Sequence, residues 1–210
     1  MSTKKRIADF NRSNILTAAK QLFINNGIAP TTMDDIAKAA DCSKSTIYVY
    51  FKSKDEIYHH IILEHFIMLK QGIDTALSEN YDFIAGYFAV CEVLVNFHEN
   101  HPLFFESILG DIKIPEDETE TVLTQIYQVG EEINKIIVLY LQNGIKNGQI
   151  SLKKPALQTA MTLWACLGAI ITMADKKALY LGKALSISKV QFMQDGFSFL
   201  LANLVVGKEN

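Results

Sequence analysis

Hydroxyl and amine side chains gather between residues 32 and 54, where their chemistry suits contact with a DNA duplex. Hydroxyl groups can donate to phosphate oxygens or base edges, ammonium groups neutralise phosphates, and a valine can pack on a thymine methyl group. The candidate DNA-binding residues are Thr32, Ser43, Lys44, Ser45, Thr46, Tyr48, Val49, Tyr50 and Lys54. Such contacts require a short helix that carries most of these side chains on an outward face.

Two short helices joined by a tight turn are predicted to position those side chains. Thr32 can cap the first helix, and Asp35, three residues further on, completes a capping box. Asp41 tolerates the left-handed conformation that a tight turn requires. Ser43 can cap a second helix that runs to about Phe51. The spacing is that of a helix-turn-helix, in which the second helix is presented to DNA.

The second helix is expected to have an inner face and an outer face. Ile47 and Phe51 lie one turn apart and should face the first helix, so that Ser45 and Val49 point away from it. The alternative is a helical hairpin buried in a core. A buried hairpin would not leave a lysine and three hydroxyl-bearing side chains on so short a helix, so the DNA-contacting interpretation is favoured.

Several residues of this region match a known pattern. They are Asp35-Ile36-Ala37, Ala40, Ser43, Thr46, Tyr48, Tyr50-Phe51 and Ser53-Lys54, together with residues 15–23 and Gly27 in the preceding segment. The region therefore resembles the DNA-binding segment of TetR-type transcriptional regulators. The chain departs from that family at Asp41 and Ser45, where glycine is frequent, and at Cys42, where valine is usual.

The resemblance implies a homodimeric repressor that is released from a palindromic operator by a small, mainly apolar ligand. Its last two helices, about residues 156–178 and 188–206, would pair with their mates across a twofold axis. The recognition helices would then reach successive major grooves, about 34 Å apart. A TetR-fold protein without an inducer, acting through a protein partner, is the alternative. A cavity of several hundred cubic ångströms would favour the first function, and a filled core the second.

The candidate walls of an effector pocket are aromatic and aliphatic side chains of the C-terminal part. They are Phe66, Tyr87, Phe88, Phe104, Ile108, Tyr127 and Trp164. Such residues suit a drug-sized apolar ligand, and a tyrosine or tryptophan can orient the ligand by a hydrogen bond.

The whole chain is predicted to be all-α, because apolar residues recur at spacings of three and four. Nine helices are expected, in a TetR-like architecture with two domains. Residues 1–53 form a three-helix DNA-binding domain, and residues 54–210 form a helical ligand-binding and dimerisation domain. After the helix-turn-helix, helices are expected at 54–79, 83–98 and 103–109, then from 118 to a turn at 144–148, at 156–178, and from 186 or 188 to 206.

The charge distribution is uneven along the chain. Residues 1–60 carry nine Lys or Arg and six Asp or Glu, whereas the remaining residues carry 11 and 17. A positive N-terminal part is expected of a protein that touches DNA with one end. Lys4, Lys5 and Arg6 could form a basic arm along phosphates, or they could form only a solvated tail.

Residues 155–174 contain no charged side chain, and their length approaches that of a membrane span. Gln158, Thr159 and Thr162 interrupt the apolar run, and lysine pairs flank it on both sides. We therefore expect a soluble helix that is buried on nearly all sides. Ala165, Gly168, Ala169 and Thr172 would let another helix approach it closely.

Other functional classes are disfavoured by what the sequence contains. Three cysteines imply no disulfide framework, and the basic N-terminal residues precede no apolar signal run, so a cytoplasmic protein is expected. His98 and His101 are three residues apart, yet a third metal ligand is not evident. No phosphate-binding loop or catalytic motif appears. We therefore expect no enzyme activity, no cofactor and no metal.

Overall fold

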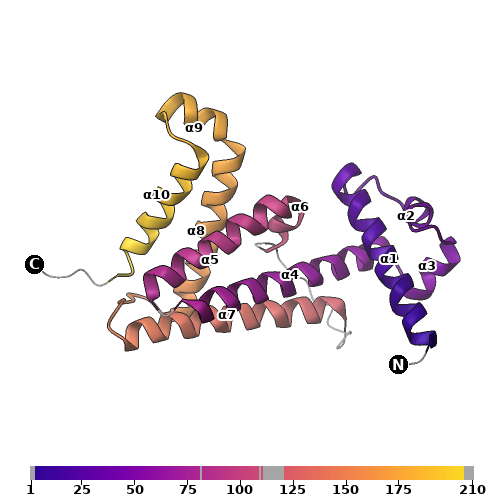
Figure 1. Ribbon diagram of the computed structural model, residues 1–210, viewed down its shortest axis with the longest axis horizontal. Helices are drawn as coiled ribbons and strands as arrows, with labels where there is room; N and C mark the ends of the chain where they lie inside the picture. The colour runs from indigo at the N-terminus through magenta and orange to yellow at the C-terminus, as the bar shows by residue number, and fades with distance from the viewer. Residues whose placement is uncertain (1–2, 81, 109, 111–120, 206–210) are drawn as a thin grey trace, which may run out of the picture. The chain divides into compact units, whose positions relative to one another are not determined.

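The computed structural model describes residues 3–80, 82–108, 110 and 121–205, and it shows the predicted all-α fold (Figure 1). These residues form two compact units. The first comprises residues 3–65 and 121–127, and the second comprises the remaining described residues. Helices α4 (Lys54–Glu79) and α7 (Val122–Lys146) each contribute to both units. The boundary between the two units within α4 lies between residues 65 and 66, 12 residues after the domain boundary expected between residues 53 and 54.

The first unit is built from α1 (Thr3–Asn26), α2 (Met33–Ala39), α3 (Lys44–Tyr50) and the beginning of α4. Its core consists of apolar side chains from all four helices, with exposed fractions near zero. They include Ile15, Ala19, Phe23, Ile36, Ile47, Phe51, Ile57 and Ile61. The burial of these residues holds α2 and α3 against α1 and α4, because apolar surface removed from water is the main stabilising contribution.

Lys4, Lys5 and Arg6, expected either as a basic arm along phosphates or as a solvated tail, belong to the first two turns of α1. Lysine and arginine are good helix formers, and neither glycine nor proline occurs before Gly27. The helix therefore extends further toward the N-terminus than the family-like segment at 15–23 indicates. Gly27, with φ of +87°, ends it.

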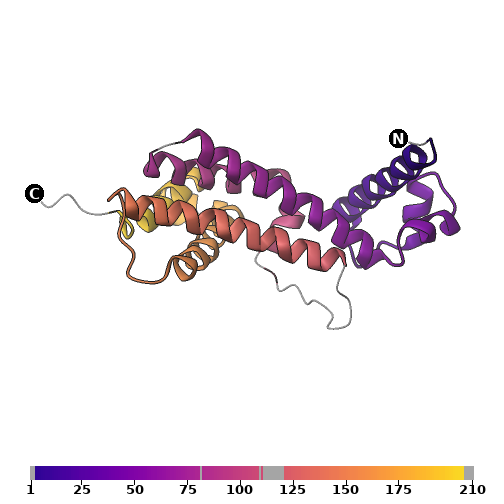
Figure 2. The same ribbon diagram turned by 90° about the horizontal axis from the view of Figure 1, so that it is seen from below.

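The second unit contains the rest of α4, α5 (Phe83–Asn100), α6 (Pro102–Phe105), the 3-10 helix η1 (Glu106–Ile108), most of α7, α8 (Ala156–Lys176), α9 (Ala178–Leu185) and α10 (Lys189–Ala202). In this unit α4 and α7 run side by side, as Figures 1 and 2 both show, and an ion pair joins Lys70 to Glu132 at 2.6 Å. Helices α8 and α10 pack closely, because Gly196 of α10 lets Ile170 of α8 approach its backbone.

The described chain has ten α-helices and one 3-10 helix instead of the nine helices expected, since α9 was not predicted. Its eight residues include Gly182, which lowers helix propensity. In the fold, α9 is held by the burial of Leu181, and it ends at Ser186, which has the left-handed φ of 56°. The expected helix at 103–109 is divided between α6 and η1. One helix was expected to begin at residue 118, and the last helix was expected to end at residue 206. Both positions lie outside the described residues.

The expectation that α8 is buried on nearly all sides is wrong for the single chain. Within its most apolar stretch, only 22% of the residues are buried. Leu157, Met161, Ala165, Ala169 and Met173, spaced by four residues, are exposed, whereas Gly168 is buried and Thr172 is half-buried.

Among the described helices, α8 alone has the length and composition of a membrane span. This is weak support for a membrane location, because helices of soluble proteins meet the same criteria.

Candidate nucleic-acid interface and apolar core cavity

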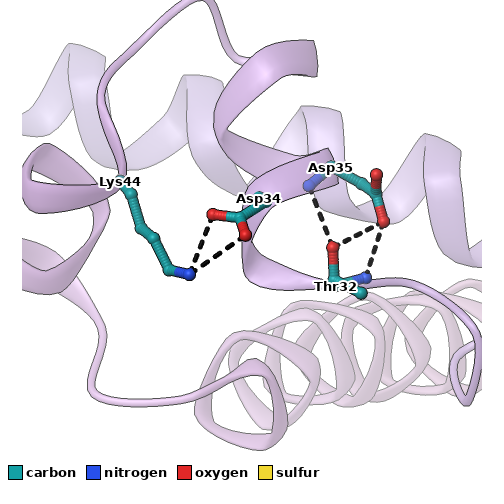
Figure 3. A network of polar contacts seen from close by, with 4 residues as sticks. All are labelled: Thr32, Asp34, Asp35 and Lys44. Atoms are coloured by element: carbon teal, nitrogen blue, oxygen red, sulfur yellow. Dashed lines mark hydrogen bonds and ion pairs between the residues drawn. The ribbon is translucent and has the colours of Figure 1, made fainter.

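The start of α2 is fixed by the predicted capping box. The Thr32 hydroxyl accepts a hydrogen bond from the Asp35 backbone N–H at 3.2 Å, and Asp35 Oδ2 accepts from the Thr32 N–H at 3.0 Å (Figure 3). The Thr32 hydroxyl also donates to Asp35 Oδ2 at 2.6 Å. These bonds stabilise the carboxylate and lower the pKa of Asp35. They also give hydrogen-bond acceptors to the backbone N–H groups of Thr32 and Asp35, which a helix terminus would otherwise leave without a partner.

The turn between α2 and α3 has the predicted left-handed residue, because Asp41 has φ of 49°. The turn is held by the Cys42 N–H, which donates to the Ala37 carbonyl at 3.0 Å, and by Asn14 Nδ2 of α1, which donates to the Ala40 carbonyl at 2.7 Å. Ser43 caps α3 as predicted, since its hydroxyl accepts from the Thr46 N–H at 3.0 Å. The turn therefore sets the direction of α3 relative to α2.

Helix α3 has the predicted inner and outer faces. Ile47 and Phe51 are buried in the first unit, while Tyr48 is 50% exposed and Val49 is 76% exposed. Lys44 and Ser45 are also exposed. An exposed valine beside tyrosine, serine and lysine side chains presents both the apolar and the polar chemistry that DNA grooves accept.

Some of the predicted DNA-binding residues make contacts within the protein. Lys54 Nζ donates to the backbone carbonyls of Ile28 and Ala29, at 2.7 and 3.0 Å, so it braces the loop between α1 and α2. The Tyr50 hydroxyl accepts from Asn11 Nδ2 at 3.2 Å. Thr46 is half-buried, and its hydroxyl lies 2.7 Å from that of Ser43.

A cluster of Arg12, Phe51 and His60 links α1, the end of α3 and α4, and it was not predicted. The Arg12 guanidinium carbon lies 5.2 Å from the centre of the Phe51 ring, and Arg12 Nη2 lies 2.9 Å from His60 Nδ1. Burial and then the Arg12 charge lower the pKa of His60. The three residues are far apart in the sequence, so no local pattern indicates their contact.

The second unit has a small apolar cavity between α5, α7 and α8. Its walls are Tyr87, Val90, Leu94, Ile137, Tyr140, Leu141, Ala160, Leu163, Trp164 and Leu167, and its volume is about 30 Å³. A cavity of this volume has room for a few water molecules at most. The core around the cavity is therefore nearly filled.

The cavity brings together only two of the seven predicted ligand-binding residues, Tyr87 and Trp164. Phe66 and Phe104 are buried elsewhere in the second unit, whereas Phe88 and Tyr127 are exposed. The side chain of Ile108 lies outside the described part of the chain. The aliphatic walls and Tyr140 were missed, because helical periodicity marks core residues without showing which of them surround a cavity.

Both tyrosine hydroxyls of the cavity wall bond to backbone carbonyls. The Tyr87 hydroxyl donates to the Phe197 carbonyl of α10 at 3.0 Å, and the Tyr140 hydroxyl donates to the Phe83 carbonyl. Burial raises the pKa of both tyrosines, and it raises the pKa of the neighbouring Cys91 to about 12. The cavity wall is therefore uncharged at neutral pH.

The two histidines considered as metal ligands pack on aromatic rings. His98 lies edge-on to Phe105, with ring centres 4.8 Å apart, and His101 lies 5.2 Å from Phe97. Among the described residues, no group of three or more His, Cys, Asp or Glu is arranged to hold a metal ion.

Comparison with known proteins identifies the DNA-binding unit. Residues 15–61 match the family of bacterial regulatory proteins described as the tetR family. The chain is 29% identical over 153 residues to the HTH-type transcriptional regulator YhgD of Bacillus subtilis, and the match covers 71% of this chain and 76% of YhgD. Residues 15–61 of this chain therefore match the DNA-binding segment of the TetR family.

Two further similarities extend over most of the chain. It is 25% identical over 197 residues to IcaR of Staphylococcus aureus, a negative transcriptional regulator of the biofilm operon icaADBC, and the match covers 90% of this chain and 96% of IcaR. A solved structure of a SmeT–triclosan complex has the same fold, with a TM-score of 0.64 and 19% identity, covering 94% of this chain and 93% of that chain. Together, the family match over residues 15–61 and these relatives indicate a DNA-binding transcriptional regulator rather than an enzyme.

Proposed function

We propose that this regulator is a cytoplasmic homodimeric repressor that binds a palindromic operator through α3 and leaves it when its C-terminal core changes shape. The outer face of α3 is the observation that carries the DNA-binding part of the proposal, because Tyr48 and Val49 are exposed while the opposite face is buried. Repression is supported by the similarity to IcaR, which is a negative regulator.

Pairing through α8 and α10 is supported by the exposed side chains of α8. Leu157, Met161 and Met173 are large apolar residues on the surface of a helix that carries no charge before Asp175. Contiguous apolar surface of this kind marks an interface in soluble proteins. A twofold homodimer formed through this face would carry two copies of α3, the number that a palindromic operator requires.

Release by a small apolar ligand that binds at Tyr87 and Trp164 requires the core cavity to open. A volume of about 30 Å³ does not admit a drug-sized molecule, so Tyr87 and Trp164 would have to move aside in the ligand-bound state. Such a ligand would favour a dimer geometry that no longer matches the spacing of the grooves. The SmeT complex with triclosan is an example of a small molecule bound to a protein of this fold.

A second candidate is a regulator without an inducer that is controlled by a protein partner. The nearly filled cavity is the observation that favours this candidate.

Nuclease footprinting on the DNA flanking the gene, repeated with a small-molecule library, separates the two candidates. A protected palindrome that is released by an apolar compound supports the inducible repressor. A protected palindrome that no compound releases supports the second candidate, and the absence of protection on any palindromic DNA contradicts both.

A further inference from the structure

An ion pair joins the two helices of the helix-turn-helix at the beginning of α3. Lys44, the first residue of α3, places Nζ 2.9 Å from Asp34 Oδ1 and 3.1 Å from Asp34 Oδ2 (Figure 3). Both side chains are exposed, and Lys44 lies on the same short helix as Tyr48 and Val49. The charge that Lys44 would offer to DNA is therefore already engaged by a carboxylate.

Asp34 takes no part in the capping box that starts α2. The capping box uses Asp35, and Asp34 adds only a negative charge within the first turn of the helix. Such a charge has a small favourable interaction with the helix dipole. The same negative charge lowers the affinity for DNA. Each lysine that neutralises a phosphate releases a counterion and strengthens binding to any sequence, and a carboxylate beside the lysine opposes this effect. A carboxylate at the same place repels the phosphates.

We propose that Asp34 limits the affinity of this regulator for the DNA backbone by holding Lys44 in an ion pair. Asp34 is thus a positioning residue for DNA binding, acting through Lys44. The Asp34 carboxylate cancels the positive charge of Lys44 while the pair is intact, so the pair weakens binding to DNA of arbitrary sequence. Weak background binding leaves the regulator free to exchange between sites. The inference rests on the DNA-binding function of the family and requires neither the operator nor the ligand of the proposed function.

The test is a double-mutant cycle on a random-sequence duplex, with Asp34→Asn, Lys44→Met and the double variant. Asp34→Asn should raise the affinity about two- to fivefold at moderate salt, the range expected for an exposed ion pair. The salt dependence of binding should steepen by about one unit of log K per log salt for each protomer. In the Lys44→Met background the gain from Asp34→Asn should be clearly smaller, because no lysine is then released.

Asp41→Asn is the matched control. Asp41 is an exposed carboxylate of the same motif, and asparagine tolerates its left-handed backbone. Its substitution removes one negative charge without releasing Lys44, so any gain should be the same with and without Lys44→Met. Circular dichroism of each variant confirms that the fold is retained.

An equal gain from Asp34→Asn in both Lys44 backgrounds would overturn the proposal, since Asp34 would then act only as a nearby charge. A loss of affinity in Asp34→Asn would also overturn it, because Asp34 would then assist DNA binding. Neither outcome would affect the proposed operator or ligand response, which are measured on different DNA and with added compounds.

Discussion

Phe51, at the end of α3, holds this helix against α1 and α4. It ends α3 and is buried, with the Arg12 guanidinium over its ring and the His60 ring edge-on at 5.5 Å. Arg12 always donates, so His60 Nδ1 must accept, and the imidazole is neutral in this arrangement. The contact therefore makes the stability of the DNA-binding unit sensitive to pH.

The sign of that sensitivity follows from the lowered pKa of His60. Burial has the largest effect on this pKa. The charged or titratable groups that also act on it are Arg12, Glu56 and His59. The unfolded chain binds a proton near pH 6.5, whereas the folded protein resists it. Stability is therefore full above about pH 6.5 and falls as the pH drops through the lower pKa of the folded state.

We predict that His60→Asn reduces this loss of stability on acidification. Asparagine can keep an acceptor oxygen near the position of Nδ1 and does not titrate. Thermal unfolding followed by circular dichroism, at pH values between 7.5 and 5, measures the difference. A residual loss is expected because burial also lowers the pKa of His59. Parallel pH profiles for the wild type and the variant would show that His60 does not contribute.

Elements whose signals are local in the sequence could be predicted, and elements that depend on distant contacts could not. The capping box at Thr32, the turn at Asp41 and the cap at Ser43 each involve neighbours within a few residues, and all were confirmed. Helix α9 was missed because its definition depends on the burial of Leu181. The cavity walls come from three helices, so the sequence pattern could not select them from the other core residues.

Tyr87 of α5 links four helices, because its ring lines the cavity together with α7 and α8 and its hydroxyl donates to a carbonyl of α10. We predict that Tyr87→Phe lowers the free energy of unfolding by about 1 kcal/mol, the typical net value of a buried hydrogen bond. The substitution leaves the ring in place, so the loss reports on the hydroxyl alone. Urea denaturation measures it. An unchanged free energy of unfolding would mean that the bond to the Phe197 carbonyl contributes nothing.

At the scale of the whole molecule, the proposed function requires two DNA-binding units on one duplex, and the exposed face of α8 is the surface proposed to join the two protomers. We predict that Met161→Arg weakens self-association at least about tenfold, because a charge buried without a partner costs more than about 1.4 kcal/mol. Sedimentation at several protein concentrations measures the effect.

Leu139→Arg provides the control for that prediction. Leu139 lies on α7 and is 49% exposed, while Met161 is 52% exposed, so both substitutions place a charge at a similarly accessible apolar position. The Leu139 variant should associate like the wild type. Normal association of the Met161 variant would exclude this face of α8 from the interface.

The central claim is that the outer face of α3 contacts DNA, and Tyr48→Ala tests it most directly. The substrate is a duplex selected from random DNA by the wild-type protein, and the control is Tyr180→Ala, a 64% exposed tyrosine on α9. Tyr48→Ala is expected to reduce the affinity about tenfold or more while retaining the fold. Tyr180→Ala should bind like the wild type. Unchanged binding by the Tyr48 variant would contradict the assignment of α3 as the recognition helix.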